Sequence, residues 1–105
     1  MSQFDVYANT NSATKKAYPY IVDLQSSLLD DLNTRIAAPL APFNKLKKQD
    51  MKRLTPVIDL EGKTFILLIP QLSATPASSL KSPIGTLAHM RTEIIDALDL
   101  AITGI

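Results

Sequence analysis

The chain contains no cysteine and no tryptophan, and only three of its 105 residues are glycine. Without cysteine it cannot form disulfides, use a catalytic thiol or bind zinc through thiolates, so stability must come from packing. The lack of cysteine also agrees with a reducing compartment, and the predicted location is cytoplasmic. The longest apolar run, residues 65–70, is far too short to span a bilayer, and no secretory signal pattern is visible at the N-terminus.

Neither sign of charge is in large excess, because the chain has 11 Lys and Arg residues and 10 Asp and Glu residues. This balance argues against direct, sequence-specific nucleic-acid binding, which relies on many phosphate contacts. The charges are unevenly spread: residues 93–105 hold acids but no base, and the basic side chains crowd one segment, at Lys45, Lys47, Lys48, Lys52 and Arg53. The two regions are predicted to face different partners, although a solvated basic surface segment also explains the lysines.

Apolar residues make up 46% of the chain, which excludes general disorder. A chain of this length buries roughly two thirds of its unfolded surface around one small core. The sequence therefore predicts a single domain over residues 1–105.

Short segments with strand-like alternation occupy most of the chain. They predict strands at residues 4–8, 17–24, 35–40, 57–60, 64–69 and 71–75. Gly62 supplies the unusual backbone angle of a hairpin turn at residues 61–63, and Pro39 places its strand at a sheet edge or near a bulge. Residues 44–54 are predicted to form one or two helical turns.

The C-terminal segment carries a helical pattern. Ser82 as N-cap and Pro83 at the first helical position predict a start near residue 83, or near Thr86 if Gly85 delays it. The predicted packed face comprises Leu87, Met90 or Arg91, Ile94, Leu98 and Ala101 or Ile102, and the opposite face comprises His89, Thr92, Glu93, Asp96, Asp99 and Thr103. Gly104 suits the left-handed position after a helix end, which leaves Ile105 as an apolar tip or a frayed terminus.

Short antiparallel strands followed by one long helix predict an α+β fold. The expected architecture is a small antiparallel β-barrel or sheet, SH3-like, with a long C-terminal helix.

No motif in the chain specifies an enzyme. Gly62-Lys63-Thr64 is similar to the end of a phosphate-binding loop, but Val57 stands where that motif needs glycine. His89 is the only histidine, which excludes a multi-histidine metal site within one chain, and its spacing to Glu93 favours a surface pair. No catalytic residue, metal site or cofactor is predicted.

Several separated segments resemble the CcdB toxins of plasmid and chromosomal toxin–antitoxin modules. The similarity is strongest at residues 21–30 and 35–40, and it includes residues 3–7, residues 54–58 and the closing Gly104-Ile105. It covers nearly the whole chain in order. The resemblance implies a homodimer with the β-rich fold shared by CcdB and the MazF/Kid ribonuclease toxins. It also implies a non-enzymatic poison that traps the cleaved gyrase–DNA complex through the gyrase A subunit and is neutralised by a CcdA-like antitoxin.

The resemblance also assigns contact residues. The family's gyrase-contacting positions correspond to Leu28, Leu29, Asp99, Ile102, Thr103, Gly104 and Ile105. In the family's best-known member a tryptophan occupies the position of Thr103 and an uncharged amide that of Asp99. A lost aromatic stack removes about 0.5–2 kcal/mol, so either the target binds more weakly or the apolar residues take a larger share. The antitoxin's flexible tail is predicted to contact Lys45, Lys47 and Lys48.

Two other functions stay open at this stage. A MazF/Kid-like endoribonuclease would use the same fold, but it needs acid–base groups near an RNA phosphate, and His89 on the predicted helix is the sole histidine. Incubation with single-stranded RNA separates this function from gyrase poisoning. The third possible function is a detoxified binding or regulatory domain, which the presence of Thr103 in place of the family's tryptophan favours.

Overall fold

The computed structural model describes residues 2–26, 28, 31–43 and 53–104. Its strands are β1 (Asp5–Ala8), β2 (Tyr20–Asp23), β3 (Thr34–Pro42), β4 (Val57–Leu60), β5 (Lys63–Leu67), β6 (Ser73–Pro76) and β7 (Gly85–Thr86). Its helices are α1 (Arg91–Thr103) and the short 3-10 segments η2 (Ile69–Gln71), η3 (Ala77–Ser79) and η4 (Ala88–Met90). Of the turns predicted within residues 44–54, all but Arg53 and Leu54 lie outside the described residues.

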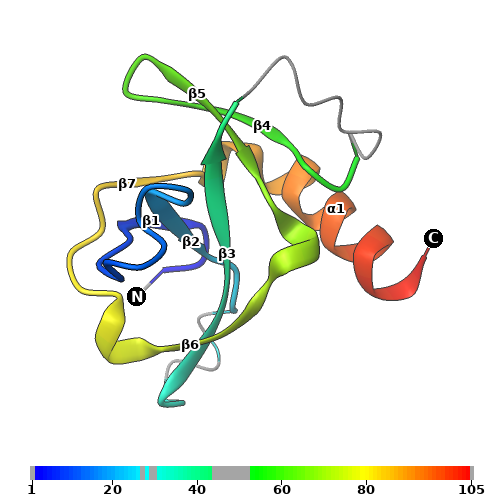
Figure 1. Cartoon of the computed structure of the whole chain (residues 1–105). Coiled ribbons are helices and arrows are strands. Elements are labelled where there is room, and N and C mark those ends of the chain that lie inside the picture. Colours follow the sequence, from blue (N-terminus) through cyan, green and yellow to red (C-terminus); the bar gives the residue numbers. More distant parts are fainter. Residues whose placement is uncertain (1, 27, 29–30, 44–52, 105) are drawn as a thin grey trace.

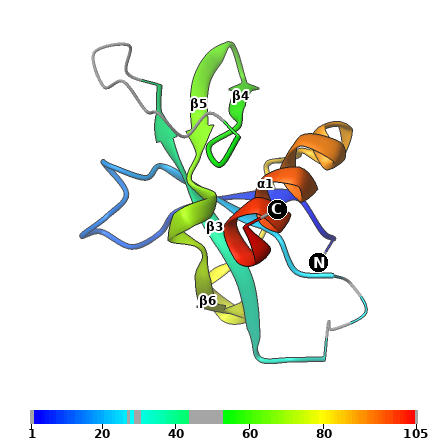
Figure 2. The ribbon, with the colours of Figure 1, turned by 90° about the vertical axis from the view of Figure 1, so that its right-hand side faces the viewer.

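The strands form one curled antiparallel sheet in the order β4-β5-β3-β2-β1-β7, and β6 also pairs with β3. The sheet closes only partly into a half-barrel, and α1 lies across one face of it (Figures 1 and 2). This arrangement confirms the predicted α+β class. No helix in the described part of the chain has the length and apolar character needed to span a membrane.

Pro39 lies in the interior strand β3, so of the two predicted placements, a sheet edge or a position near a bulge, the edge is wrong. On one side β3 pairs with β2, and on the other it pairs first with β6 and then with β5. Its carbonyl accepts the N–H of Leu68 at 3.0 Å, in the break between those two partners where η2 follows. Within a strand the amide and carbonyl of one residue point to the same side. The missing amide hydrogen of Pro39 therefore falls at an interruption of the ladder, where its loss is tolerated.

The β4–β5 hairpin confirms the turn predicted around Gly62. Leu60 pairs with Lys63, and the two residues between them have positive φ angles, 52° at Glu61 and 78° at Gly62. Two successive left-handed residues are the signature of the type I′ turn, whose twist matches that of the flanking strands.

Replacing Gly62 by alanine is expected to lower the free energy of unfolding by about 1 kcal/mol, because a Cβ is disfavoured at positive φ. No atom lies within 4 Å of the added Cβ, so backbone strain alone would cause the loss. Urea unfolding measures it. Gly85→Ala is the matched control, since its φ angle is ordinary and its Cβ would lie 3.7 Å from Leu60 Cδ1. Equal losses in both variants would contradict the explanation.

The core lies between the sheet and α1. Val22, Ala38 and Leu40 of β2 and β3 belong to the same buried cluster as Ile94 and Ala97 of the helix. The predicted packed face of the helix is thus confirmed at Leu87 and Ile94. The residues predicted on its opposite face, His89, Thr92, Glu93, Asp96, Asp99 and Thr103, are exposed.

The predicted helix start near Pro83 is wrong, because α1 begins at Arg91. Gly85 and Thr86 pair with β1 as the short strand β7, and the amides of Ile84 and Leu87 donate to the carbonyls of Val6 and Phe4. These strand bonds replace the first helical turn. The alternative start near Thr86 is closer, since Thr86 Oγ1 accepts the Ala88 N–H at 3.1 Å where η4 begins.

Candidate functional site

The C-terminal end of α1 is an exposed, partly apolar tip. Ile102 is 70% exposed, and Ala101, Thr103 and Gly104 are exposed beside it. Gly104 takes the left-handed conformation at φ 74°, and its N–H donates to the Leu100 carbonyl at 3.0 Å. The predicted glycine cap is confirmed. It closes the helix in a defined geometry, so the tip has a fixed direction.

The prediction that Ala101 or Ile102 continues the packed face of the helix is wrong. The fully buried helical residues stop at Ala97, and Leu98 and Leu100 are only half-buried. Figure 1 shows the last turn, in red, projecting beyond the strands, so the sheet does not cover it. Ala101 follows the buried Ala97 by four residues and so lies on the same face of the helix, yet it is exposed because the sheet does not extend that far.

Asp99 and Thr103 give the tip its polar character. Thr103 Oγ1 donates to the Asp99 carbonyl at 2.6 Å, which occupies the hydroxyl hydrogen inside the helix. The last turn holds no basic side chain, and helix C-termini carry a partial negative charge. Asp99 adds a full negative charge at that pole. The tip therefore combines an apolar side chain with negative potential, a combination that suits a partly basic target surface.

Leu28 is 92% exposed, the largest exposed fraction among the large apolar side chains in the described part of the chain. Its N–H donates to Ser26 Oγ at 3.2 Å. At this exposure Leu28 packs neither into the core nor against Ile102. The two apolar parts of the predicted site are thus separate, outward-facing projections within one chain. Leu29 and Ile105 lie outside the described residues.

Arg53, from the basic segment, contacts the acidic helix within the same chain. Its guanidinium forms an ion pair with Asp96 of α1, with Nη2 at 3.1 Å from Oδ1. Both side chains are more than half exposed, so solvent screening leaves this pair little energy. It still ties the start of the segment before β4 to the helix. Lys45, Lys47 and Lys48 lie outside the described residues.

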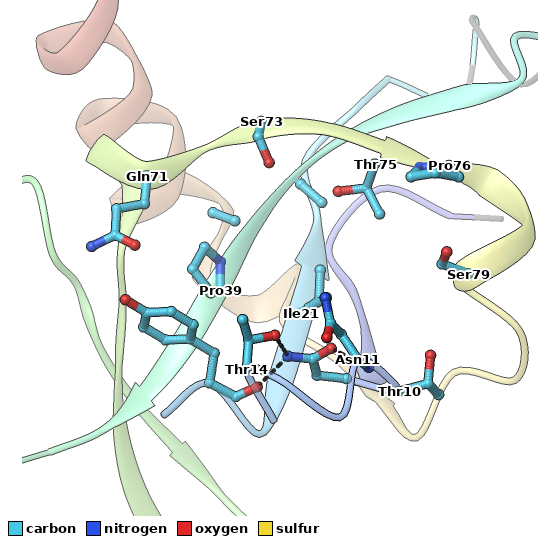
Figure 3. Close-up of a pocket in the computed structure, with 14 residues that line it drawn as sticks. Thr10, Asn11, Thr14, Ile21, Pro39, Gln71, Ser73, Thr75, Pro76 and Ser79 are labelled. Atoms are coloured by element: carbon cyan, nitrogen blue, oxygen red, sulfur yellow. Dashed lines mark hydrogen bonds between the residues drawn. The ribbon is translucent and has the colours of Figure 1, made fainter. Parts of the chain in front are cut away.

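A cavity of about 460 Å³ opens on the other face of the sheet from α1. Figure 3 shows Ser73 and Thr75 of β6 on one side and Thr10, Asn11 and Thr14 on the other. The loop that carries Thr10, Asn11 and Thr14 is held by Asn9 Nδ2, which donates to Thr14 Oγ1 at 3.0 Å and to the Tyr18 carbonyl at 2.8 Å. The lining mixes uncharged polar side chains with apolar ones such as Ile21 and Pro39, and it includes no Asp, Glu, His, Lys or Arg.

No cluster of three or more His, Asp or Glu side chains able to hold a metal ion occurs among the described residues. His89 is exposed in η4 instead of lying on α1 as predicted. The exposed tip and Leu28 can offer apolar contact and charge to another protein.

A buried polar group that was not predicted from the sequence lies at the end of β2. Asp23 and Arg35 form an ion pair with Nη2 2.8 Å from Oδ2, and their side chains are 0% and 1% exposed. Gln25 is buried beside them. The signal for this group was present in the sequence, as an aspartate and an arginine within two otherwise apolar strands.

The comparison with protein families identifies the family of the chain. The sequence profile described as CcdB protein matches residues 3–104, which is almost the entire chain. Membership of this family implies a toxin of the gyrase-poisoning class, generally non-enzymatic, from toxin–antitoxin systems. The chain therefore belongs to the CcdB protein family.

Proposed function

We propose that this protein binds the DNA gyrase A subunit through the C-terminal end of α1 and through Leu28, and so traps the cleaved gyrase–DNA complex. The observation that carries the proposal is the apolar, uncovered helix tip in a chain that belongs to the CcdB family. A large side chain such as Ile102, exposed at 70%, has most of its apolar area available for burial by a partner. Full burial of such a side chain contributes about 1.5–3 kcal/mol.

The same proposal assigns roles to the remaining tip residues. Gly104 fixes the direction in which the chain leaves the helix, and Asp99 directs the tip toward positive potential on the target. Thr103, whose hydroxyl bonds back to the helix, contributes its methyl group and modest area where a tryptophan would stack. Leu28 and Ile102 then supply most of the apolar contact, and Leu29 and Ile105 complete the proposed set.

The partners follow from the same family membership. We propose that the protein acts in the cytoplasm as a homodimer over one domain of residues 1–105, and that a CcdA-like antitoxin neutralises it. Lys45, Lys47 and Lys48 are the proposed contacts for the antitoxin tail. A homodimer presents two helix tips and two copies of Leu28, and two linked contacts raise the effective affinity for a dimeric target.

The test is calorimetric binding to the isolated dimerisation fragment of the gyrase A subunit. Deleting Thr103, Gly104 and Ile105 is expected to weaken binding at least about a hundredfold, since it removes the cap of the helix and the end of the tip. The fold is expected to survive, because Thr103 and Gly104 are exposed and Ile105 follows them at the end of the chain.

Circular dichroism and urea unfolding of the truncated chain provide the control for folding. Equal affinities of the full and truncated chains would exclude the tip as the contact site. No binding by the full chain would contradict the proposed target itself, and cleavage of single-stranded RNA by the full chain would favour the MazF/Kid-like reading.

A further inference from the structure

The β2–β3 ladder ends in an unusual way at Leu24. The amide of Leu24 donates to the carbonyl of Ile36 at 2.8 Å, as expected for paired strands. The bond in the opposite direction is replaced: the Ile36 N–H donates to Gln25 Oε1 at 3.0 Å, and the Leu24 carbonyl accepts from Gln3 Nε2 at 3.1 Å. Side chains, not strand pairing, therefore decide where the chain leaves the sheet.

The Asp23–Arg35 pair holds the next residue by its backbone. Asp23 Oδ1 accepts the Gln25 N–H at 3.0 Å. Arg35 donates from Nε to Asp23 Oδ2 at 3.0 Å and from Nη2 to the Gln25 carbonyl at 3.2 Å. Both polar backbone groups of Gln25 are thus bound by a single buried ion pair, and its side chain is bound to β3. The backbone of Gln25 has little freedom to rotate.

The position of this pair in the fold is informative. Asp23 and Arg35 point away from the main core, because Val22 and Leu24, on either side of Asp23, belong to it. Buried ion pairs are often matched in stability by apolar side chains of similar volume, because desolvation offsets their attraction. A stability role alone therefore does not account for the group, whereas a role in fixing one backbone path does.

The held residue lies just before an exposed apolar projection. Gln25 is three positions before Leu28, and the Leu28 N–H donates to Ser26 Oγ. Leu28, at 92% exposure, receives no positioning from packing. The direction in which it projects must come from the backbone that precedes it, and that backbone is anchored at Gln25.

We propose that Asp23, Arg35 and Gln25 are positioning residues for the target-binding surface, and that they act through Leu28. Resting on the proposed gyrase contact, this inference adds that the ion pair sets the projection of Leu28 and leaves the α1 tip unaffected. A backbone already held at Gln25 favours binding through Leu28, because ordering that backbone on binding would subtract from affinity.

The test is a double-mutant cycle on affinity for the gyrase A fragment. Asp23→Leu together with Arg35→Met removes both charges at similar volume, which favours retention of the fold. This pair of substitutions is expected to weaken binding about tenfold, the same as Leu28→Ala alone, which corresponds to about 1.4 kcal/mol. In the doubly substituted background, Leu28→Ala is expected to change affinity less than about twofold, because its contact is already lost.

Ile102→Ala is the matched control for the cycle. Its effect on affinity is expected to be the same in the parent and in the doubly substituted background, because the α1 tip is held by other contacts. Arg35→Lys serves as a second variant that keeps the charge but loses the planar fork, and it is expected to weaken binding in the same direction. Urea unfolding confirms that each variant is folded under the conditions of binding.

The outcomes separate this inference from the proposed function. Additive effects of Leu28→Ala and the paired substitutions, or unchanged affinity in a folded variant, would leave the ion pair a purely structural feature and overturn the inference alone. Failure of both the paired variant and Arg35→Lys to fold would also overturn it, because the group would then be a folding requirement. If the parent chain does not bind the gyrase fragment, the proposed function fails and this inference fails with it.

Discussion

Ile102→Asp is expected to abolish trapping of the cleaved gyrase–DNA complex while leaving the protein folded. Ile102 is 70% exposed on the last turn of α1, so little of its area contributes to the core. Burial of the isoleucine by a target contributes about 1.5–3 kcal/mol, and an unpaired aspartate in the same place adds a desolvation cost. The combined loss corresponds to more than about a hundredfold in affinity. Linearisation of plasmid DNA by gyrase in the presence of the toxin measures the effect.

The control for Ile102→Asp adds the same charge elsewhere on the same helix. Thr92→Asp lies in the first turn of α1, where an acidic side chain is favourable, and Thr92 is exposed. This variant is expected to trap the cleaved complex as well as the parent chain. Equal loss of trapping in the two variants would point to a general effect of charge, and normal trapping by Ile102→Asp would exclude the helix tip from the contact.

Ile94→Ala is expected to produce the largest loss of stability among single substitutions in α1. Ile94 is 0% exposed and packs in the core formed by the helix and the inner face of the sheet. Truncation of a buried isoleucine to alanine costs about 2–5 kcal/mol, because it removes apolar burial and leaves a cavity. Domains of this kind have a total stability of only about 5–15 kcal/mol. Urea unfolding at equilibrium measures the change directly.

Ile102→Ala is the matched control for this loss, since it is the same substitution two turns further along the same helix. We expect it to lower the free energy of unfolding by less than about 0.5 kcal/mol, as surface substitutions generally do. The two variants together separate the two functions of α1: Ile94 holds the helix to the sheet, and Ile102 faces outward. Similar stability losses at both positions would show that the tip is covered within the folded protein.

Local chemistry made the hairpin at Gly62 and the cap at Gly104 predictable. Both need a left-handed backbone, and glycine adopts it without a Cβ penalty. The charged face of α1 was predictable for a similar reason, because the helical period places Glu93, Asp96 and Asp99 together. The sequence similarity to CcdB toxins, now supported by the family match over residues 3–104, indicated the α+β fold with its C-terminal helix.

Non-local pairing explains the incorrect predictions. Ser82 and Pro83 form a good local helix start, but β1 binds the amides of Ile84 and Leu87, and the helix begins later. Pro39 was compatible with a sheet edge or an irregularity in the ladder, and the sequence does not reveal that the strand beside β3 changes from β6 to β5 there. Neither outcome follows from nearby residues.

The sequence by itself determined the left-handed turns, the hydrophobic period of the helix and the family of the chain, because these depend on residue type and short-range spacing. Only the tertiary structure decided that Ile102 and Leu28 remain outside the core and that Asp23 and Arg35 meet inside it. A periodic pattern states which side a residue faces but not whether another element covers that side. The length of α1 relative to the sheet, and the register of β2 against β3, supply that information.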